Sequence, residues 1–405
     1  MPTAATLPEI GERGHVLPAP GDPARLECFI PSPCVQNHAA NIMPLGNGDL
    51  GCVWFGGTQE GMADISIYFS RLPRGSDRWT PAVKLSEDAA RSEQNPILFS
   101  TPEGPLWLIF TAQRSGNQDT AFVRRRVSHD DGATWGPVET LFAPEEGRGL
   151  FVRQPPAVLA NGDWLLPVFH CQGVPGRKWV GDLDTSAVKL SSDRGATWRE
   201  VAVPGSLGCV HMNIVQLRDG TLLAHYRSRW ADSIYESRSD DGGASWSAPV
   251  ATALPNNNSS IQAAALADGR LALVFNDVNA EGATERRASL YDEIEDEEDA
   301  EDAGAPGGAA PEGAAPGARS AFWGVPRAPM TLALSSDGGR TWTKRNLEVG
   351  DGYCMTNNSR DRTNREFSYP SVKQDRDGSL VIAFTYFRQA IRFVRVRPEW
   401  VEAAP

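Results

Sequence analysis

The feature that most constrains the fold is an eight-residue pattern, Ser-x-Asp-x-Gly-x-x-Trp, which occurs four times in the chain. The copies begin at Ser128, Ser191, Ser239 and Ser335, and a degraded fifth copy keeps its tryptophan, Trp79. The pattern is typical of a tight turn, because an Asp side chain accepts hydrogen bonds from nearby backbone N–H groups and Gly adopts positive φ. We expect each Trp to pack against a neighbouring sheet. Recurring turns of one kind predict a repeated structural unit.

A second repeat places a turn glycine between two apolar runs, which is the pattern of a β-hairpin. The glycines are Gly48, Gly104, Gly162, Gly220, Gly269 and Gly378, at spacings of 56, 58, 58, 49 and 109 residues. Six hairpins, most of them followed by an aspartate turn, predict an all-β, six-bladed β-propeller of four-stranded antiparallel blades. We expect a single domain over residues 25–400. The last unit lacks an aspartate turn, so residues 25–30 are expected to supply its outer strand.

Composition agrees with this architecture and isolates one segment. The 405 residues include 39 Gly, 30 Pro and 12 Trp, a turn-rich and aromatic-rich mixture. Of the net charge of −12, residues 292–319 carry −9, from ten acidic residues and one basic residue. An acidic run followed by Ala, Gly and Pro cannot bury enough apolar area to fold, so residues 291–320 are predicted to be a disordered insertion in the fifth blade. The nearly neutral remainder gives no reason to expect a nucleic acid or a membrane as partner.

Several sequence features bear on location and cofactors. The first fifteen residues lack the basic and apolar regions of a secretory signal, and no apolar run approaches the roughly 18 residues of a membrane span. The six cysteines form no CxxC pair, and His and Cys do not cluster at zinc-binding spacing. We therefore expect a cytoplasmic protein with reduced thiols that needs no metal or other cofactor. The sequence does not indicate its oligomeric state.

Hairpin geometry predicts where polar side chains meet. Residues about nine positions before each hairpin glycine, and seven to ten after it, lie at one end of the two innermost strands. The polar residues expected at this end are His38, Asn41, Asn95, Arg153, Gln154, His170, His211, Arg227, Asn276, Tyr369 and Arg388. A planar guanidinium donates two parallel hydrogen bonds to a carboxylate, and Arg153, Arg227 and Arg388 come from three different blades. This end of the propeller is therefore predicted to bind an anionic or hydroxyl-rich ligand.

The aspartate turns are similar to the Asp-box (BNR) repeats of the sialidase-like superfamily. The stretches NHAANIMPLGNGDLGCVWFGGTQEG, WGVPRAPMTLALSSDGGRTW and REFSYPSVKQDRDGSL resemble its predicted neuraminidase branch. The resemblance implies a six-bladed propeller, in agreement with the hairpin count, and an exo-acting glycosidase that binds a small glycan. It also implies a cluster of three arginines around the substrate carboxylate, for which Arg153, Arg227 and Arg388 are the candidates.

The resemblance further implies roles for individual residues. Sialidases use a tyrosine nucleophile, which implies Tyr369 here. Glu366 is a possible partner, although an extended strand would leave it on the opposite face, ~10 Å away. The family takes its acid/base from a loop of the first blade, which implies Glu60, whereas Asp64 is expected to cap the following strand. His38 or His211 could transfer protons instead, since an imidazole titrates near neutral pH.

One stretch departs from the family pattern. Sialidases carry Arg-Ile-Pro in the first blade, where this chain has Asn41-Ile42-Met43-Pro44, and Arg327 is the expected substitute for the missing arginine. The main hypothesis is an exo-acting glycoside hydrolase that cleaves a terminal acidic or hydroxyl-rich sugar. Two alternatives stay open, a non-catalytic carbohydrate-binding propeller and a lyase or hydrolase that acts on another uronic-acid or deoxy-sugar glycan.

Overall fold

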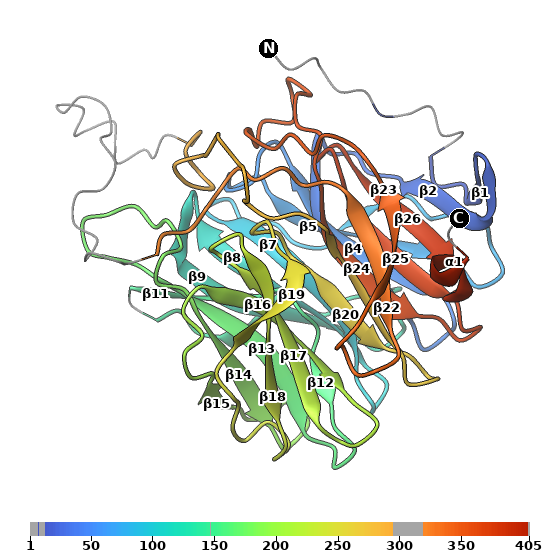
Figure 1. Ribbon diagram of the computed structural model, residues 1–405, viewed down its shortest axis with the longest axis horizontal. Coiled ribbons are helices and arrows are strands. Elements are labelled where there is room, and N and C mark those ends of the chain that lie inside the picture. The colour runs from blue at the N-terminus through green and yellow to red at the C-terminus, as the bar shows by residue number, and fades with distance from the viewer. Residues whose placement is uncertain (1–6, 8–12, 146, 295–318, 404–405) are drawn as a thin grey trace.

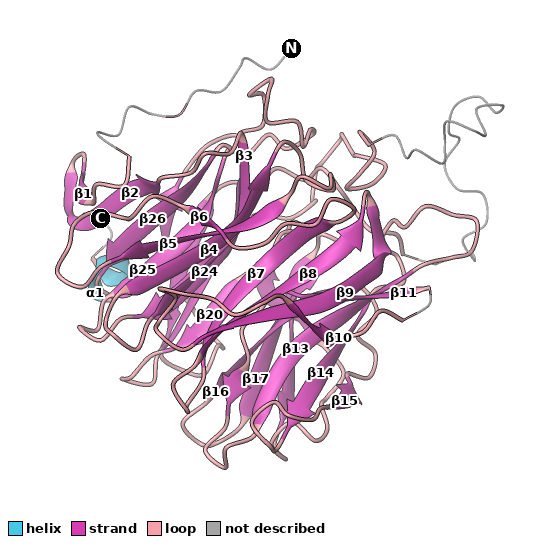
Figure 2. Ribbon diagram, turned by 180° about the vertical axis from the view of Figure 1, so that it is seen from behind, coloured by secondary structure: helices cyan, strands magenta, loops and turns pink. Residues whose placement is uncertain are grey.

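The strands form six antiparallel sheets that follow one another around a ring. The computed structural model describes residues 7, 13–145, 147–294 and 319–403. The innermost strand of each sheet contacts the next sheet, and the sixth sheet contacts the first, so the sheets are the blades of the predicted β-propeller (Figure 1). A short helix, α1 (Glu399–Glu402), lies near the C-terminus among the strands (Figure 2). Within the described part of the chain, none of the helices has the length and apolar character to cross a bilayer.

The first three blades occupy residues 36–202. Blade one consists of β3 (Gln36–Pro44), β4 (Leu50–Gly57), β5 (Ser66–Leu72) and β6 (Val83–Lys84). Blade two consists of β7 (Ser92–Ser100), β8 (Leu106–Arg114), β9 (Asn117–Ser128) and β10 (Glu139–Phe142). Blade three has an interrupted inner strand, β11 (Arg148–Val152) and β12 (Ala157–Val158), followed by β13 (Trp164–Gln172), β14 (Thr185–Ser191) and β15 (Arg199–Ala202).

The last three blades complete the ring. Blade four consists of β16 (Cys209–Gln216), β17 (Leu222–Ser228), β18 (Ser233–Ser239) and β19 (Val250–Pro255). Blade five consists of β20 (Gln262–Ala265), β21 (Leu271–Asn276), β22 (Met330–Ser335) and β23 (Thr343–Glu348). Blade six consists of β24 (Phe367–Gln374), β25 (Leu380–Tyr386), β26 (Ala390–Val396), β2 (Asp22–Ile30) and β1 (Leu17–Ala19).

The N-terminal segment closes blade six, as the sequence predicts. Strand β2 pairs antiparallel with β26, from Leu26 opposite Arg395 to Ile30 opposite Ile391. The two strands lie side by side in both ribbon views (Figures 1 and 2). Strand β1 adds a fifth strand outside β2. Joining the two chain ends in one sheet closes the ring through backbone hydrogen bonds and leaves no open gap between the first and last blades.

The four aspartate turns join the third and fourth strands of blades two to five, and the Ser and Asp side chains of each turn bond to each other. In the first copy, Ser128 Oγ accepts the Gly132 N–H at 2.8 Å, and the Asp130 carboxylate accepts the backbone N–H and the hydroxyl of Thr134 at 2.8 and 2.6 Å. These hydrogen bonds lower the pKa of Asp130 to about 2. The tryptophan of this turn, Trp135, packs edge-on against Phe69 of blade one, as predicted.

At the opposite end of the blades, the inner strands carry matching β-bulges. In blades one, two, four and six, two inner-strand residues oppose one residue of the second strand. The first residue of each bulge has positive φ and stands nine positions before its hairpin glycine; these residues are Ala39, Asn95, His211 and Tyr369. A bulge re-aims the side chain that it carries. We call this end of the propeller the mouth.

Just beyond the bulges, side chains tie neighbouring blades together. Asn41 Oδ1 accepts the Leu98 N–H at 2.9 Å, and Asn213 Oδ1 accepts the Ala263 N–H. The Gln262 and Ser371 side chains make the same bond across the next two interfaces, to Val372 and Ile42 respectively. That Asn41 also contacts ligand stays a prediction. Its carbonyl oxygen is used between blades one and two, because the bulge turns position 41 away from the mouth.

Most of the predicted insertion in blade five, residues 295–318, lies outside the described residues. Its first residues are described, and there the structure differs from the predicted disorder. Tyr291 is 1% exposed, and it packs with Ile294 in a hydrophobic cluster. Both apolar side chains lie among the first acidic residues, so composition averaged over the segment hides two apolar side chains that a neighbouring surface can bury.

Candidate functional site

Tyr369 lies at the centre of the polar residues at the mouth. Its bulge on β24 gives it φ of 51°, and its ring packs against His38 and His211, with centroid distances of 4.3 and 5.6 Å. The Tyr369 hydroxyl oxygen accepts a hydrogen bond from Arg227 Nη1 at 2.6 Å. His211 Nε2 lies 3.4 Å from the same Arg227 nitrogen. The bulges in blades four and six thus bring the Tyr369 hydroxyl and the His211 ring to one guanidinium group.

Three arginines from three blades surround the Tyr369 ring. The Cζ atoms of Arg153, Arg227 and Arg327 lie 5.3, 5.6 and 5.8 Å from its centroid. Burial lowers the pKa of Arg153 to about 10 and that of Arg227 to about 9, so both stay charged at neutral pH. Arg327 is one of the three, and it comes from the segment between the predicted insertion and β22. Arg388, predicted as the third member of the cluster, has other partners.

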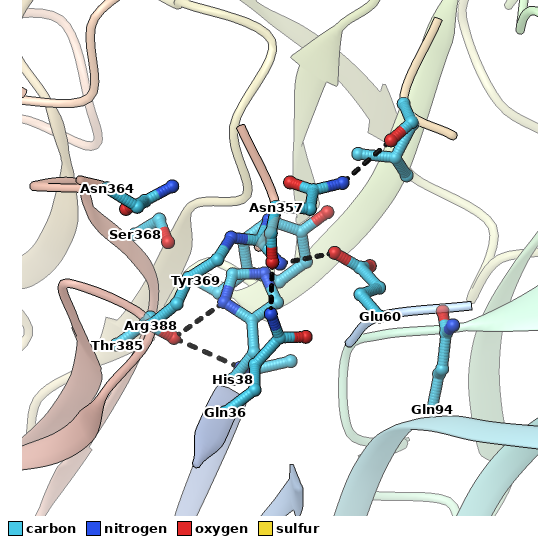
Figure 3. Close-up of polar contacts among 12 residues, drawn as sticks. Gln36, His38, Glu60, Gln94, Asn357, Asn364, Ser368, Tyr369, Thr385 and Arg388 are labelled. Carbon is cyan, nitrogen blue, oxygen red and sulfur yellow. Dashed lines mark hydrogen bonds and ion pairs between the residues drawn. The ribbon is translucent and has the colours of Figure 1, made fainter. Parts of the chain in front are cut away.

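Arg388 belongs to a chain of buried ion pairs. Its Nη1 donates to Glu60 at 2.5 Å (Figure 3). Its Nε lies 3.2 Å from Glu366, which also pairs with Arg327 Nη1 at 2.9 Å. Burial alone would raise the pKa of Glu366, but Arg327, Arg388 and His38 outweigh it and hold that pKa well below its ordinary value. The loop that carries Glu60 is closed by Asp64, whose carboxylate accepts from the backbone and hydroxyl of Thr58.

Glu366 reaches the mouth although simple strand alternation would place it elsewhere. It directly precedes β24, and Ser368 Oγ donates to its Oε1 at 2.5 Å while Asn364 Nδ2 donates to its Oε2 at 3.1 Å. Its Oε1 also lies 3.8 Å from His38 Nδ1. The bulge at Tyr369 breaks the two-residue alternation on which the predicted separation rests. Glu366 therefore pairs with Arg327 and Arg388. The Tyr369 hydroxyl is hydrogen-bonded to Arg227 and not to Glu366.

Both histidines of the mouth are neutral. Burial lowers the pKa of His211 well below its usual range, and Arg227 and Arg229 lower it further. The pKa of His38 is also lowered well below its usual range, by burial and by Arg388, although Glu366 opposes this. His38 Nδ1 bonds to Thr385 Oγ1 at 2.9 Å (Figure 3). His38 Nε2 and His211 Nδ1 are buried without a hydrogen-bond partner, so each ring keeps one free nitrogen.

The mouth holds more positive charge than its carboxylates neutralise. Four buried arginines face two buried carboxylates. Together with His38, His211 and Tyr369 they form a cluster of nine polar residues, each at most 6% exposed; the arginines are Arg153, Arg227, Arg327 and Arg388, and the carboxylates are Glu60 and Glu366. Arg153 Nη1 and Arg227 Nη2 are buried without a partner. Arg153 Nη2 bonds three backbone carbonyls across the mouth, those of residues 40, 369 and 370. Buried charge without a counter-ion is costly, so this arrangement favours an anionic ligand.

Several predicted site residues lie outside the cluster. His170 Nε2 bonds Glu200 on the outer strand of blade three, at 3.0 Å. Gln154 is used within the ring, bonded to the Ile261 carbonyl and to Gln262. Asn276 Nδ2 donates to the carbonyls of residues 329 and 367. Each of these three side chains has a structural partner, and contact of any of them with ligand stays a prediction. Asn95 occupies the matching bulge of blade two.

Sequence reasoning missed the residues that cover the mouth. Tyr291 accepts hydrogen bonds from Gln113 and Gln118 at 3.1 and 3.0 Å, and the Trp323 ring lies 5.6 Å from Arg227 Cζ. Both belong to the connection between the second and third strands of blade five. The corresponding connections of blades one and six carry Glu60 and Arg388, so this connection reaches the mouth in several blades. Aromatic residues in the same connection of blade five were therefore the sequence signal for residues that cover the mouth. Among the described residues, no group of three or more His, Cys, Asp or Glu could hold a metal ion.

Comparison with solved structures shows the same fold in several sialidases. The Hadza microbial sialidase matches with a TM-score of 0.65 at 13% identity, over 91% of this chain and 66% of that one. A protein of unknown function from Dyadobacter fermentans matches with a TM-score of 0.64 at 15% identity, over 92% and 99%. The intramolecular trans-sialidase from Ruminococcus gnavus matches with a TM-score of 0.62 at 12% identity, over 91% and 96%. At such identities the likeness establishes the fold and leaves activity open.

The family is established by a different comparison. No curated protein matches this chain. The model of the BNR repeat-like domain, however, matches residues 48–382, which is most of the sequence. The match spans five of the six inner hairpin turns in full, all four aspartate turns, and Tyr369. This protein therefore belongs to the family of BNR repeat-like domain proteins.

Proposed function

We propose that the protein is an exo-acting glycoside hydrolase that cleaves a terminal acidic sugar at the mouth of the propeller. The observation that carries the proposal is the Tyr369 hydroxyl, bonded to Arg227 at 2.6 Å inside a cluster of buried arginines that outnumber the carboxylates. The free nitrogens of Arg153 and Arg227 suit a sugar carboxylate. The sialidase neighbours support this class of reaction through their fold.

In the first chemical step, Tyr369 oxygen attacks the anomeric carbon and the glycosidic C–O bond breaks. Arg227 stabilises the negative charge that develops on the phenol oxygen, and the phenolic proton passes to His211, whose Nε2 lies 3.4 Å from the same Arg227 nitrogen. Glu60 protonates the leaving oxygen. Because Glu60 pairs with Arg388, a ligand carboxylate that draws Arg388 toward itself frees Glu60 to carry that proton.

In the second step, water replaces the tyrosine. Glu60, now a carboxylate, takes a proton from water as its oxygen attacks the anomeric carbon, and the Tyr369 phenolate recovers its proton from His211. Glu366 touches no reacting atom in this scheme. It positions Arg327 and Arg388, which lie 2.9 and 3.2 Å from its carboxylate oxygens.

The test is a panel of chromogenic glycosides of sialic, uronic and neutral sugars, assayed with the wild-type protein and with Tyr369→Phe. We expect release from an acidic glycoside and a fall in kcat/KM of about 10³-fold in the variant. Tyr386→Phe is the control, because Tyr386 packs among Phe29, Phe367 and Phe387. Equal turnover in Tyr369→Phe and wild type would contradict the proposed nucleophile.

One observation favours a second candidate, a non-catalytic glycan-binding propeller. Both carboxylates of the site are engaged by arginines, and a binding protein needs no proton donor. This candidate predicts that an acidic sugar binds without any turnover and that binding survives Glu60→Gln. Turnover of any glycoside in the panel that depends on Tyr369 would reject it.

A further inference from the structure

Two described segments of the fifth blade, residues 287–294 and 321–325, lie across the mouth, and we call them the lid. They are joined to one another by an isolated β-bridge between Arg287 and Trp323. Although they belong to blade five, their side chains pack with other blades. The hydrophobic cluster that holds Tyr291, Ile294 and Trp323 also contains Ala121, Phe151, Phe169, Trp179 and Val210, from blades two, three and four.

The lid closes directly over residues of the candidate site. Gly61 follows Glu60, and a Cβ atom at Gly61 would lie 2.6 Å from Ile294 Cδ1 and 3.1 Å from the Tyr291 ring. On the other side of the mouth, Trp323 lies 5.6 Å from the Cζ of Arg227 and 5.0 Å from that of Arg229. The lid therefore seals both the proposed proton donor and the arginine that holds Tyr369.

The closed arrangement leaves little room beneath the lid. A cavity of about 10 Å³ lies between the lid and the ion-pair chain, lined among others by Arg287, Trp323, Arg327 and Glu366. This volume is at the lower limit for a single water molecule. No sugar fits into it, and the cluster residues around Tyr369 are themselves at most 6% exposed. This cavity therefore admits no sugar to Arg327 and Glu366 while the lid is in place.

The lid is attached in a way that permits such movement. Gln113 and Gln118 donate to the Tyr291 hydroxyl, Lys178 Nζ donates to the Ile294 carbonyl, and the Ala321 N–H donates to Asp182. These four contacts use side chains, and the Phe322 N–H adds one backbone bond, to the Arg229 carbonyl of blade four at 2.7 Å, in contrast to the continuous backbone ladders of the blades. Segments held by few backbone ladder bonds open at a lower free energy than the strands of a sheet.

We propose that the lid is a moving, specificity-determining wall of the mouth. Ligand enters when Tyr291 and Trp323 part from the other blades, and closure behind it restricts the site to one terminal sugar. The inference rests on the proposed function for the identity of the ligand, whereas the movement itself follows from the contacts of the lid.

The experiment measures how fast phenylglyoxal modifies individual arginines of the full chain, by peptide mass spectrometry. Arg227 lies under the lid, whereas Arg392, which is 4% exposed and pairs with Glu27, is equally buried in blade six away from it. The Tyr291→Phe substitution leaves Gln113 and Gln118 without their acceptor in the closed state. The matched control is Tyr68→Phe, which removes a hydroxyl from β5.

We expect Tyr291→Phe to speed modification of Arg227 about fivefold, the effect of a lost buried hydrogen bond, with Arg392 unchanged and Tyr68→Phe equal to wild type. Amide hydrogen exchange of residues 287–294 should rise in the same variant. Equal rates of Arg227 modification in Tyr291→Phe and wild type would overturn the proposal that the lid moves. N-acetylneuraminic acid is added as the probe in a separate arm. A faster Arg227 reaction that the probe does not slow supports the lid and counts against the proposed ligand alone.

Discussion

The two ends of the propeller solve the problem of polar groups in opposite ways. At the aspartate-turn end, the Ser and Asp side chains of each copy bond within a few residues, as in the bonds from Thr197 and Gly195 to Asp193 and Ser191, although the indole N–H groups of Trp135 and Trp246 lack partners. At the mouth, partners come from blades far apart in sequence, and buried nitrogens of Arg153, Arg227 and both histidines lack partners. We interpret the aspartate-turn end as a scaffold and propose that a ligand at the mouth supplies the missing hydrogen-bond partners.

The two ends also differ in how closely the repeats resemble one another. The turn is built four times in nearly the same geometry, with Ser-to-Asp hydrogen bonds of 2.8 Å in every copy. The four bulges at the mouth are equally regular in backbone, but they carry Ala39, Asn95, His211 and Tyr369. A common backbone with different side chains is how a repeated fold acquires a single site.

The largest effect on stability is expected at the mouth. Glu366→Gln removes the carboxylate that faces Arg327 and Arg388 and leaves both charges buried, so it should lower the free energy of unfolding by about 3–5 kcal/mol. Urea unfolding measures the change. Glu145→Gln, which breaks an exposed pair with Arg148, should cost less than about 1 kcal/mol. Similar losses in both variants would remove the contrast between the mouth and the surface.

The next effect depends on pH. The pKa of His211 is lowered well below its unfolded value of about 6.5, so the unfolded chain takes up a proton first as the pH falls. Stability from this residue is complete above about pH 6.5 and is lost below it, by roughly 2 kcal/mol between pH 7 and pH 5. Urea unfolding at both pH values should show a smaller loss for His211→Asn than for wild type. The exposed residue His129 provides the control, since His129→Asn should keep the wild-type loss.

A smaller effect tests the ties between blades. Asn41→Ala leaves the buried N–H of Leu98 without an acceptor, which should cost about 1–3 kcal/mol of stability while ligand affinity stays unchanged. Thermal unfolding and titration with an acidic sugar measure the two quantities. Weakened binding with unchanged stability would show that Asn41 contacts the ligand.

The smallest effect on stability is expected at the aspartate-turn end. Ser191→Ala removes the hydroxyl that accepts from Gly195 and donates to Asp193, at 2.8 Å each, and should cost about 1 kcal/mol. Turnover should not change, because this turn lies at the far end of the blade. The neighbouring exposed residue gives the control, Ser192→Ala, which should be neutral. A loss of turnover in Ser191→Ala would show that the two ends are coupled.

The fold was predictable because its signals are local. The hydrogen bonds of each aspartate turn span four residues, and the hairpin glycines all have positive φ, so a sequence pattern reports them directly. The count of six hairpins then fixes the number of blades. The same counting located Tyr369 and His211, since the bulges stand at a constant distance from the glycines.

The site was only partly predictable, for two physical reasons. A bulge shifts the alternation of side chains, so the sequence could not show that Asn41 turns toward blade two or that Glu366 turns toward the mouth. The lid depends on contacts between distant segments, as between Tyr291 and Gln118, and no pattern in sequence reports such a contact. Arg327 was found only through the resemblance to sialidases, because it lies on no hairpin position.

The central claim is that Tyr369 attacks an acidic sugar at the mouth. The most direct measurement is peptide mass spectrometry of the protein after incubation with a fluorinated acidic glycosyl fluoride, which slows release of a covalent intermediate. The account predicts a sugar adduct on the peptide that contains Tyr369, absent in Tyr369→Phe. An adduct on Glu60 or Glu366 instead, or hydrolysis of acidic glycosides without any adduct on Tyr369, would contradict it.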